Sequence, residues 1–299
     1  MNRAQGLAIQ WLFASFLFCV AVTASAQMPS PETEGFTSNN KEARAQALAG
    51  LEHERAGRYV EAIGAYECAL ELAPNDAGLF NNLGTAFAKL HLHGEATAAL
   101  QRAIKLNPSF ALAYFNLGSV YDQTNQPTEA ISALTRALAL NSQLTKARVE
   151  LCELRLSLEQ NSEAVACYKD LLRLAPSDAK AHTNFSIALV RLNRYKEAIV
   201  ALQETTRRFP THAEAYNVLG SALIETKCYK DAVVALTRAL ELDPSHEAAH
   251  FNLALAQLAI QNRVAALEQY AFLKYWNAAL AQRLYEVIYG TQLLSAGRK

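Results

Sequence analysis

The amino-acid sequence predicts an all-α protein made of about seven helix-turn-helix units stacked side by side. The first observation behind this prediction is a lattice of prolines with a spacing of 34 residues. The second is an alanine that recurs at one point of every unit, and the third is the helical spacing of apolar residues in a chain with few glycines and prolines. The lattice prolines are Pro74, Pro108, Pro176, Pro210 and Pro244, with Ser142 at the one vacant point.

The composition supports a folded protein without a strong charge field. The 299 residues are 51% hydrophobic and 19% charged, which allows a substantial core and argues against a disordered chain. Lys+Arg and Asp+Glu both total 28, so the formal net charge is zero. Because there is no basic field to attract phosphates, we do not expect a nucleic-acid partner.

Residues 1–26 have the pattern of a secretory signal peptide. Arg3 gives a positive start, residues 7–22 are almost entirely apolar, and Ala24 and Ala26 are small residues at the positions that a signal peptidase reads. We therefore expect cleavage after Ala26 and a mature chain that is periplasmic or secreted. The alternative is an uncleaved segment that anchors the chain in a membrane, with the repeats outside the cytoplasm.

Placing each lattice proline at position 32 of a unit divides the rest of the chain into repeats. A flexible leader is expected at 27–42 and a capping helix with a tail at 281–299. The seven repeats cover residues 43–76, 77–110, 111–144, 145–178, 179–212, 213–246 and 247–280. Position 20 is alanine in all of them, at Ala62, Ala96, Ala130, Ala164, Ala198, Ala232 and Ala266.

The third repeat shows how such a unit forms two helices. Tyr114 and Leu117 belong to a run of apolar residues at helical spacing, and Pro127 is suited to open the second helix, where its missing N–H costs little. Gly118 and Ala130 are small, which lets the two antiparallel helices approach closely. Each lattice proline should end a second helix, and a residue of a capping type follows it: Asn75, Ser109, Ser177, Thr211 or Ser245.

These features resemble the tetratricopeptide repeat, a helix-turn-helix unit of this length. The resemblance rests on the Leu-Gly pair at positions 7 and 8, the alanine at position 20, the large residue at position 24 and the terminal proline. It implies a right-handed superhelical solenoid in which the first helix of each pair lines a concave groove. Repeats four, five and seven depart from the pattern, with Cys152, Ser186 and Ala254 in place of the glycine.

The resemblance also implies which side chains face the groove. Asparagines at positions 5 and 6 offer donors and acceptors that could hold the main chain of an extended peptide, or they are ordinary consensus residues facing water. Charged residues of repeats four and five would form a spot that selects a basic ligand segment. The candidate groove residues are Asn81, Asn82, Asn116, Ser119, Lys146, Glu150, Glu153, Lys180, Asn184, Asn217 and Asn252.

The sequence favours a binding protein over an enzyme. The repeats occupy 43–280, which leaves no room for a catalytic domain, and no phosphate loop or nucleophile motif is present. His91, His93 and Glu95 form the tightest histidine cluster, but they fall in a turn and are not expected to bind a metal. No cofactor is expected. The leading hypothesis is a protein- or peptide-binding adaptor, and the alternatives are a self-associating spacer and a polysaccharide-binding groove.

Four cysteines remain after the expected cleavage: Cys68, Cys152, Cys167 and Cys228. An oxidising compartment would allow disulfides. Cys152 and Cys167 lie on the two helices of one repeat, but position 8 is expected to lie opposite positions 20 and 21, which makes their pairing marginal. The expectation is therefore that all four cysteines are free and buried.

Overall fold

The computed structural model describes residues 39–296, with side chains up to residue 289, and this part of the chain contains only α-helices. The helices are α2 (Lys41–Arg55), α3 (Tyr59–Leu72), α4 (Ala77–Lys89), α5 (His93–Leu106), α6 (Ala111–Gln123), α7 (Pro127–Leu140), α8 (Thr145–Ser157), α9 (Asn161–Leu174), α10 (Ala179–Arg191), α11 (Tyr195–Arg208), α12 (Ala213–Glu225), α13 (Tyr229–Leu242), α14 (Glu247–Ala259), α15 (Arg263–Trp276) and α16 (Ala278–Ala296). The predicted all-α helix-turn-helix fold is confirmed.

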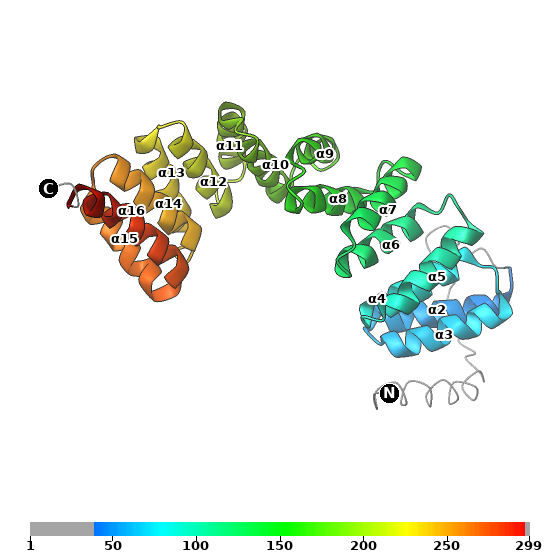
Figure 1. Ribbon diagram of the computed structural model, residues 1–299. Helices are drawn as coiled ribbons and strands as arrows, with labels where there is room; N and C mark the ends of the chain where they lie inside the picture. The colour runs from blue at the N-terminus through cyan, green and yellow to red at the C-terminus, as the bar shows by residue number, and fades with distance from the viewer. Residues whose placement is uncertain (1–38, 297–299) are drawn as a thin grey trace. The chain divides into compact units, whose positions relative to one another are not determined.

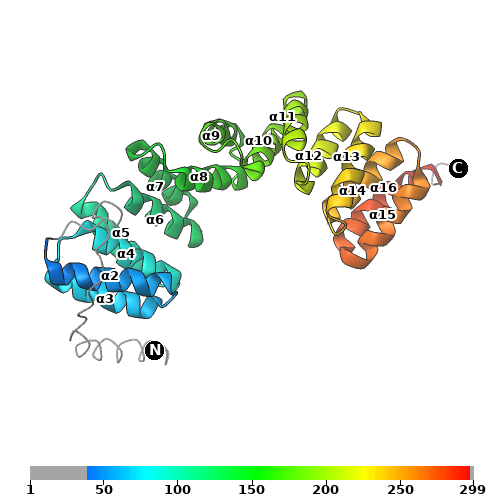
Figure 2. The same ribbon diagram turned by 180° about the vertical axis from the view of Figure 1, so that it is seen from behind.

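The chain forms two compact units, an N-terminal unit up to Leu151 and a C-terminal unit from Cys152, with the boundary inside α8. Within each unit, successive helices pair as hairpins, such as α4–α5 and α12–α13 (Figures 1 and 2). The first helices of repeats two to seven begin at the predicted first residue of the repeat: Ala77, Ala111, Thr145, Ala179, Ala213 and Glu247.

Every hairpin turn contains one residue in the left-handed backbone conformation, always at position 15 of the repeat. The residue after it donates its N–H back to the first helix, as Leu92 does to Phe87 O at 3.0 Å. This bond satisfies a carbonyl at the end of the helix and reverses the chain. The left-handed residues are Gly57, His91, Asn125, Glu159, Asn193, Lys227 and Gln261.

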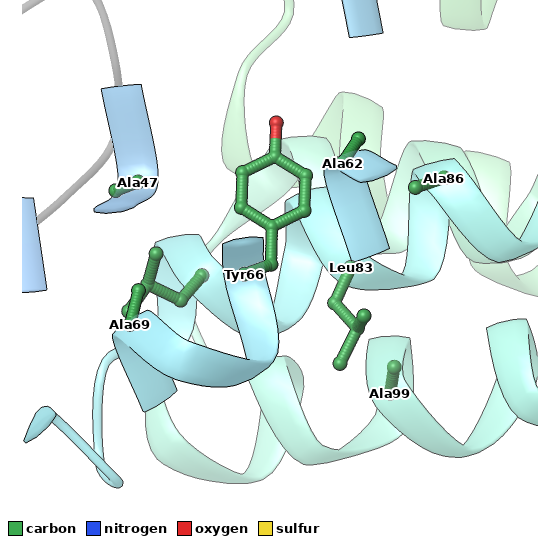
Figure 3. Packing of buried hydrophobic residues seen from close by; sticks show 8 residues of the cluster. Ala47, Ala62, Tyr66, Ala69, Leu83, Ala86 and Ala99 are labelled. Carbon is green, nitrogen blue, oxygen red and sulfur yellow. The ribbon is translucent and has the colours of Figure 1, made fainter. Parts of the chain in front are cut away.

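Small residues let the helices of a hairpin pack closely. A Cβ added to Gly84 would lie 2.7 Å from Cγ of Leu100, and one added to Gly118 would lie 2.8 Å from Cγ of Leu134. Position 8 therefore lies opposite position 24. In the first repeat position 24 is Tyr66, whose ring fills the core among surrounding alanines (Figure 3).

The disulfide between Cys152 and Cys167 corrects the expectation of free cysteines. Their Cα atoms are 5.4 Å apart, within the range that a disulfide bridges. The predicted placement of position 8 opposite positions 20 and 21 is wrong. Position 8 instead faces position 24, one residue from Cys167 at position 23. Cys228 is exposed and Cys68 is half-buried, so neither is a fully buried core residue.

Two helix ends and the capping residues also differ from the sequence predictions. Helix α2 begins two residues early because Asn40 accepts the N–H of Glu42, and α16 begins at Ala278 because Asn277 accepts the N–H of Leu280. Each predicted capping residue lies one position too early in the sequence. The residues that directly precede α4, α6, α10, α12 and α14 are Asp76, Phe110, Asp178, His212 and His246.

The predicted signal peptide and nearly all of the leader lie outside the described residues. Among residues 39–296, no helix combines the length and the apolar character needed to cross a bilayer.

Candidate functional site

A hollow of about 320 Å³ lies in the N-terminal unit against helices α4, α5, α6 and α8. It gathers four of the predicted groove residues: Asn116, Ser119, Lys146 and Glu150. Thr85 and Lys89 of α4 and Phe115 of α6 also line it, and sequence reasoning did not select these three. The first helices of repeats two, three and four thus contribute to one concave site of mixed polar and apolar chemistry.

Glu150 is the acidic residue of this hollow. It is half-buried, and its Oε2 accepts a hydrogen bond from the Ser119 hydroxyl at 2.6 Å. Lys89 and Lys146 are exposed at the same hollow. The hollow therefore has two ammonium groups and one hydrogen-bonded carboxylate. This excess of positive charge disfavours a ligand that carries only positive charge.

The predicted asparagine ladder is arranged as pairs between neighbouring repeats. Asn116 Nδ2 donates to Asn81 Oδ1 at 2.8 Å, and Asn252 Nδ2 donates to Asn217 Oδ1 at 2.9 Å. Asn81 and Asn217, both at position 5, are buried. Asn82 is half-buried and accepts from Asn81 Nδ2 at 3.1 Å. The position 5 amides thus hold adjacent repeats together, whereas the position 6 amides stay partly accessible.

The remaining predicted groove residues lie in the C-terminal unit. Lys180 Nζ is 2.6 Å from Glu153 Oε1, so this carboxylate is already paired with a cation. Asn184 is half-buried beside the hydroxyl of Tyr168. Burial raises the pKa of Tyr168 to about 12, although the nearby Asn184 amide lowers it. Within the C-terminal unit, these residues therefore form a polar cluster of their own.

A hydrogen-bonded contact that the sequence did not reveal joins His246 to Glu214. The His246 Nε2 atom is 2.6 Å from Glu214 Oε2. The hydrogen bond to Glu214 raises the pKa of His246 above its usual value. Glu214 also accepts from Asn217 Nδ2 at 3.4 Å, which connects the contact to the asparagine pair.

The histidine cluster in the second repeat packs through its rings. The ring centroids of His91 and His93 are 5.7 Å apart, with one edge toward the other face. In the part of the chain that the structure describes, no group of three or more His, Cys, Asp or Glu side chains could hold a metal ion.

Protein-family models identify the repeats. Models of the tetratricopeptide repeat match residues 81–144, 123–184, 155–222 and 213–246. These matches run without a gap from residue 81 to 246, which is more than half of the 299 residues. The chain belongs to the tetratricopeptide repeat family. No curated protein sequence matches it.

Several solved structures share this fold. YrrB, described as a TPR protein with an unusual peptide-binding site, is 24% identical with a TM-score of 0.58, over 62% of this chain and 95% of YrrB. A MamA structure is 25% identical with a TM-score of 0.51, over 55% of this chain and 96% of MamA. The pilF protein of Pseudomonas aeruginosa is 15% identical with a TM-score of 0.56, over 69% and 95% of the two chains.

Proposed function

We propose that this tetratricopeptide repeat protein is a non-enzymatic adaptor that holds an extended segment of a partner protein against the first helices of repeats two to four. The observation that carries the proposal is the hollow of about 320 Å³, which gathers Asn116, Ser119, Lys146 and Glu150. A site of this size accepts two or three peptide residues, and longer segments would continue along the neighbouring first helices.

The chemistry of the hollow suits an extended main chain. Asn116 donates to Asn81 and to Thr85, so within residues 39–289 its amide acts as a donor, and its carbonyl oxygen is left to accept a peptide N–H. The Lys89 and Lys146 ammonium groups can donate to peptide carbonyls or to an acidic side chain. Phe115 adds an apolar surface for a ligand side chain.

The matched family models and the similar solved structures support a binding protein, without identifying what it binds. The matched family models describe a repeat and not a catalytic domain. YrrB, which has a similar fold, is described as having a peptide-binding site. A fold hosts many functions, so it is the hollow of this chain that supports peptide binding here.

The adaptor is proposed to act outside the cytoplasm, in the periplasm or after secretion. The Cys152–Cys167 disulfide supports this location, because disulfides persist mainly in oxidising compartments. The signal-peptide pattern of residues 1–26 is independent support. N-terminal sequencing of the exported protein tests the location: a mature chain that starts at Gln27 agrees with it, and an intracellular chain that retains Met1 contradicts it.

A peptide-binding measurement tests the adaptor function. Peptides of about ten residues are selected by display against the chain from Gln27 onward, and the dissociation constant of the best peptide is measured by calorimetry. The combined substitutions Lys89→Glu and Lys146→Glu should weaken binding at least about tenfold, which corresponds to about 1.4 kcal/mol. Lys105→Glu is the matched control, because Lys105 is an exposed lysine on the second helix α5.

Failure to select any peptide would contradict the adaptor proposal. So would a peptide whose affinity falls equally in the control and in the hollow variant, because a general charge effect would then explain the binding.

A further inference from the structure

The segment that precedes the first helix has a charge that complements the hollow of the N-terminal unit. This segment, residues 27–38, lies outside the described part of the chain. Its sequence contains two acidic residues, Glu32 and Glu34, and no lysine or arginine. The hollow has the opposite balance, because Lys89 and Lys146 line it and its one carboxylate already accepts a hydrogen bond within the fold.

Both lysines of the hollow are accessible to a ligand. Lys89 lies in the last turn of α4 and Lys146 in the first turn of α8, and both are exposed. Among residues 39–289, neither lysine takes part in an ion pair, whereas Lys180 of the C-terminal unit is paired with Glu153. An incoming carboxylate therefore meets two cations without having to displace another acidic group from them.

Two carboxylates and a phenyl ring alternate along the segment. Glu32, Glu34 and Phe36 are spaced two residues apart, so in an extended backbone all three side chains would point to one side. The hollow offers the matching groups on α4, α6 and α8, namely two ammonium groups and the ring of Phe115. The pattern therefore fits the extended ligand for which the hollow is proposed.

The segment is also long enough to reach the hollow. Glu32 precedes Asn40, the N-cap of α2, by eight residues, which span about 26–29 Å when extended. Helix α3 packs against both α2 and α4, so α4 lies within two helix spacings of α2, about 20 Å. Since α4 is itself about 20 Å long, Lys89 at its far end is at most about 30 Å from the start of α2. The long lysine and glutamate side chains make up the small remaining difference.

We propose that residues 27–38 dock in this hollow and compete there with the partner segment. The inference rests on the proposed function, because both ligands use the same site. A short tethered segment has an effective concentration of about 1 mM, which gives the chain's own segment an advantage over a free ligand of similar affinity. A partner must therefore bind more tightly than the tethered segment to occupy the hollow.

Photo-crosslinking in the full chain, with no peptide added, tests the docking. Benzoylphenylalanine replaces Phe115, which keeps an aromatic ring in the hollow, and the irradiated chain is digested with trypsin. Residues 27–41 stay within one tryptic fragment, because Lys41 is their only lysine or arginine. Mass spectrometry should find this fragment joined to the fragment that carries position 115. The crosslinked chain should keep the mobility of a monomer on a denaturing gel, because the segment docks within its own copy.

A charge swap tests whether the lysines hold the segment. The double variant Glu32→Lys/Glu34→Lys should lower the yield of the crosslink at least about threefold, because like charges would then face each other. Adding Lys89→Glu/Lys146→Glu to that variant should restore the yield, since the opposite charges are then exchanged between the segment and the hollow.

Two controls accompany these variants. Glu61→Lys/Glu129→Lys makes the same change in net charge at exposed residues of α3 and α7, and it should leave the yield unchanged. Benzoylphenylalanine at Val60 of α3, which is 66% exposed, should give no crosslink to residues 27–41.

Four outcomes overturn the proposal. The first is the absence of a crosslink from position 115, and the second is an equal yield from position 60. The third is a crosslink that forms only between two copies, because the segment would then not dock within its own chain. The fourth is a yield that does not respond to the charge swap, because the lysines would then not hold the segment.

Peptide affinity separates this inference from the proposed function. The selected peptide should bind Glu32→Lys/Glu34→Lys about threefold more tightly than wild type, as expected if the displaced segment has a dissociation constant of about 0.5 mM and an effective concentration of about 1 mM. Glu61→Lys/Glu129→Lys should not change the affinity. An equal affinity in wild type and in the segment variant overturns the competition and leaves the adaptor function standing. A crosslink from position 115 without any selectable peptide would support the docking and contradict the adaptor.

Discussion

The Asn116 amide donates a 2.8 Å hydrogen bond to the buried carbonyl oxygen of Asn81, which ties the first helix of repeat three to that of repeat two. Asn252 and Asn217 repeat the arrangement in the C-terminal unit, at 2.9 Å. In both pairs the donor is at position 6 and the acceptor at position 5 of the preceding repeat. The same side chains thus stabilise the stacking of the repeats and shape the surface offered to a ligand.

Removing the acceptor of one pair should destabilise the chain. Asn81→Ala leaves the partly buried Asn116 amide without its main partner, and we expect the free energy of unfolding to fall by about 1–2 kcal/mol. Urea denaturation followed by circular dichroism measures the change. A double-mutant cycle with Asn116→Ala should give a coupling energy of about 1 kcal/mol, and strictly additive losses would contradict the bond.

Filling the glycine position of a hairpin should also destabilise it. The Cβ of Gly84→Ala would lie 2.7 Å from Leu100 Cγ and 3.1 Å from Ala96 O. Overpacking costs about 1–3 kcal/mol and outweighs the gain of about 1 kcal/mol from helix propensity. Gly94→Ala is the matched control, because nothing lies within 4 Å of its Cβ. Thermal unfolding measures both variants. Gly84→Ala should lower the stability of the chain, and Gly94→Ala should be neutral or slightly stabilising.

The disulfide should contribute measurably to stability. Cys152 and Cys167 are separated by 15 residues, a loop for which chain entropy predicts about 3 kcal/mol. The double variant Cys152→Ser/Cys167→Ser should lower the free energy of unfolding by about this amount, and Cys228→Ser should not change it. Maleimide labelling of the denatured, unreduced wild-type chain should modify Cys228 but neither Cys152 nor Cys167. Labelling of all three would show that the disulfide is absent.

The His246–Glu214 contact should make stability depend on pH. The pKa of His246 is raised in the folded chain, chiefly by its hydrogen bond to Glu214. Its contribution is therefore fully present below the unfolded pKa of about 6.5 and is lost as the pH rises through the higher folded pKa. The difference in stability between wild type and His246→Gln should be larger at pH 5.5 than at pH 9. An NMR titration that places the pKa of His246 below 6.5 would refute the contact.

Protonation of His246 has one opposing effect. The Nδ1 atom accepts a 3.4 Å hydrogen bond from the N–H of Ala249, and a second ring proton would abolish it. Because this bond is long, the charge-assisted bond to Glu214 should dominate.

The helical architecture could be predicted from the sequence because its causes are local. A proline that follows a helix prevents its continuation, and alanine allows close packing, so the regular spacing of both indicates where the next helices begin. The left-handed residue at position 15 gave no such signal, since only Gly57 is a glycine and the other turns use residues such as Glu159 and Lys227. The hydrogen bonds of the turn impose this conformation, whatever the side chain.

The site was only partly predictable because it depends on contacts between repeats. The sequence pointed to Asn116, Ser119, Lys146 and Glu150, which share a hollow. It could not show that Asn81 is buried beneath Asn116, because that depends on how one repeat stacks on the next. The disulfide was underestimated for a similar reason, since position 8 faces position 24 only once the exact offset of the two helices is known.

Photo-crosslinking from Phe115 tests the central claim most directly, because this side chain lines the proposed peptide hollow. Benzoylphenylalanine replaces Phe115 in one variant and the exposed Val60 of α3 in another, and each is irradiated with the selected peptide. The account predicts a crosslink from position 115 and none from position 60. A peptide that crosslinks from position 60 alone would contradict it, because the ligand would then lie on the second helices.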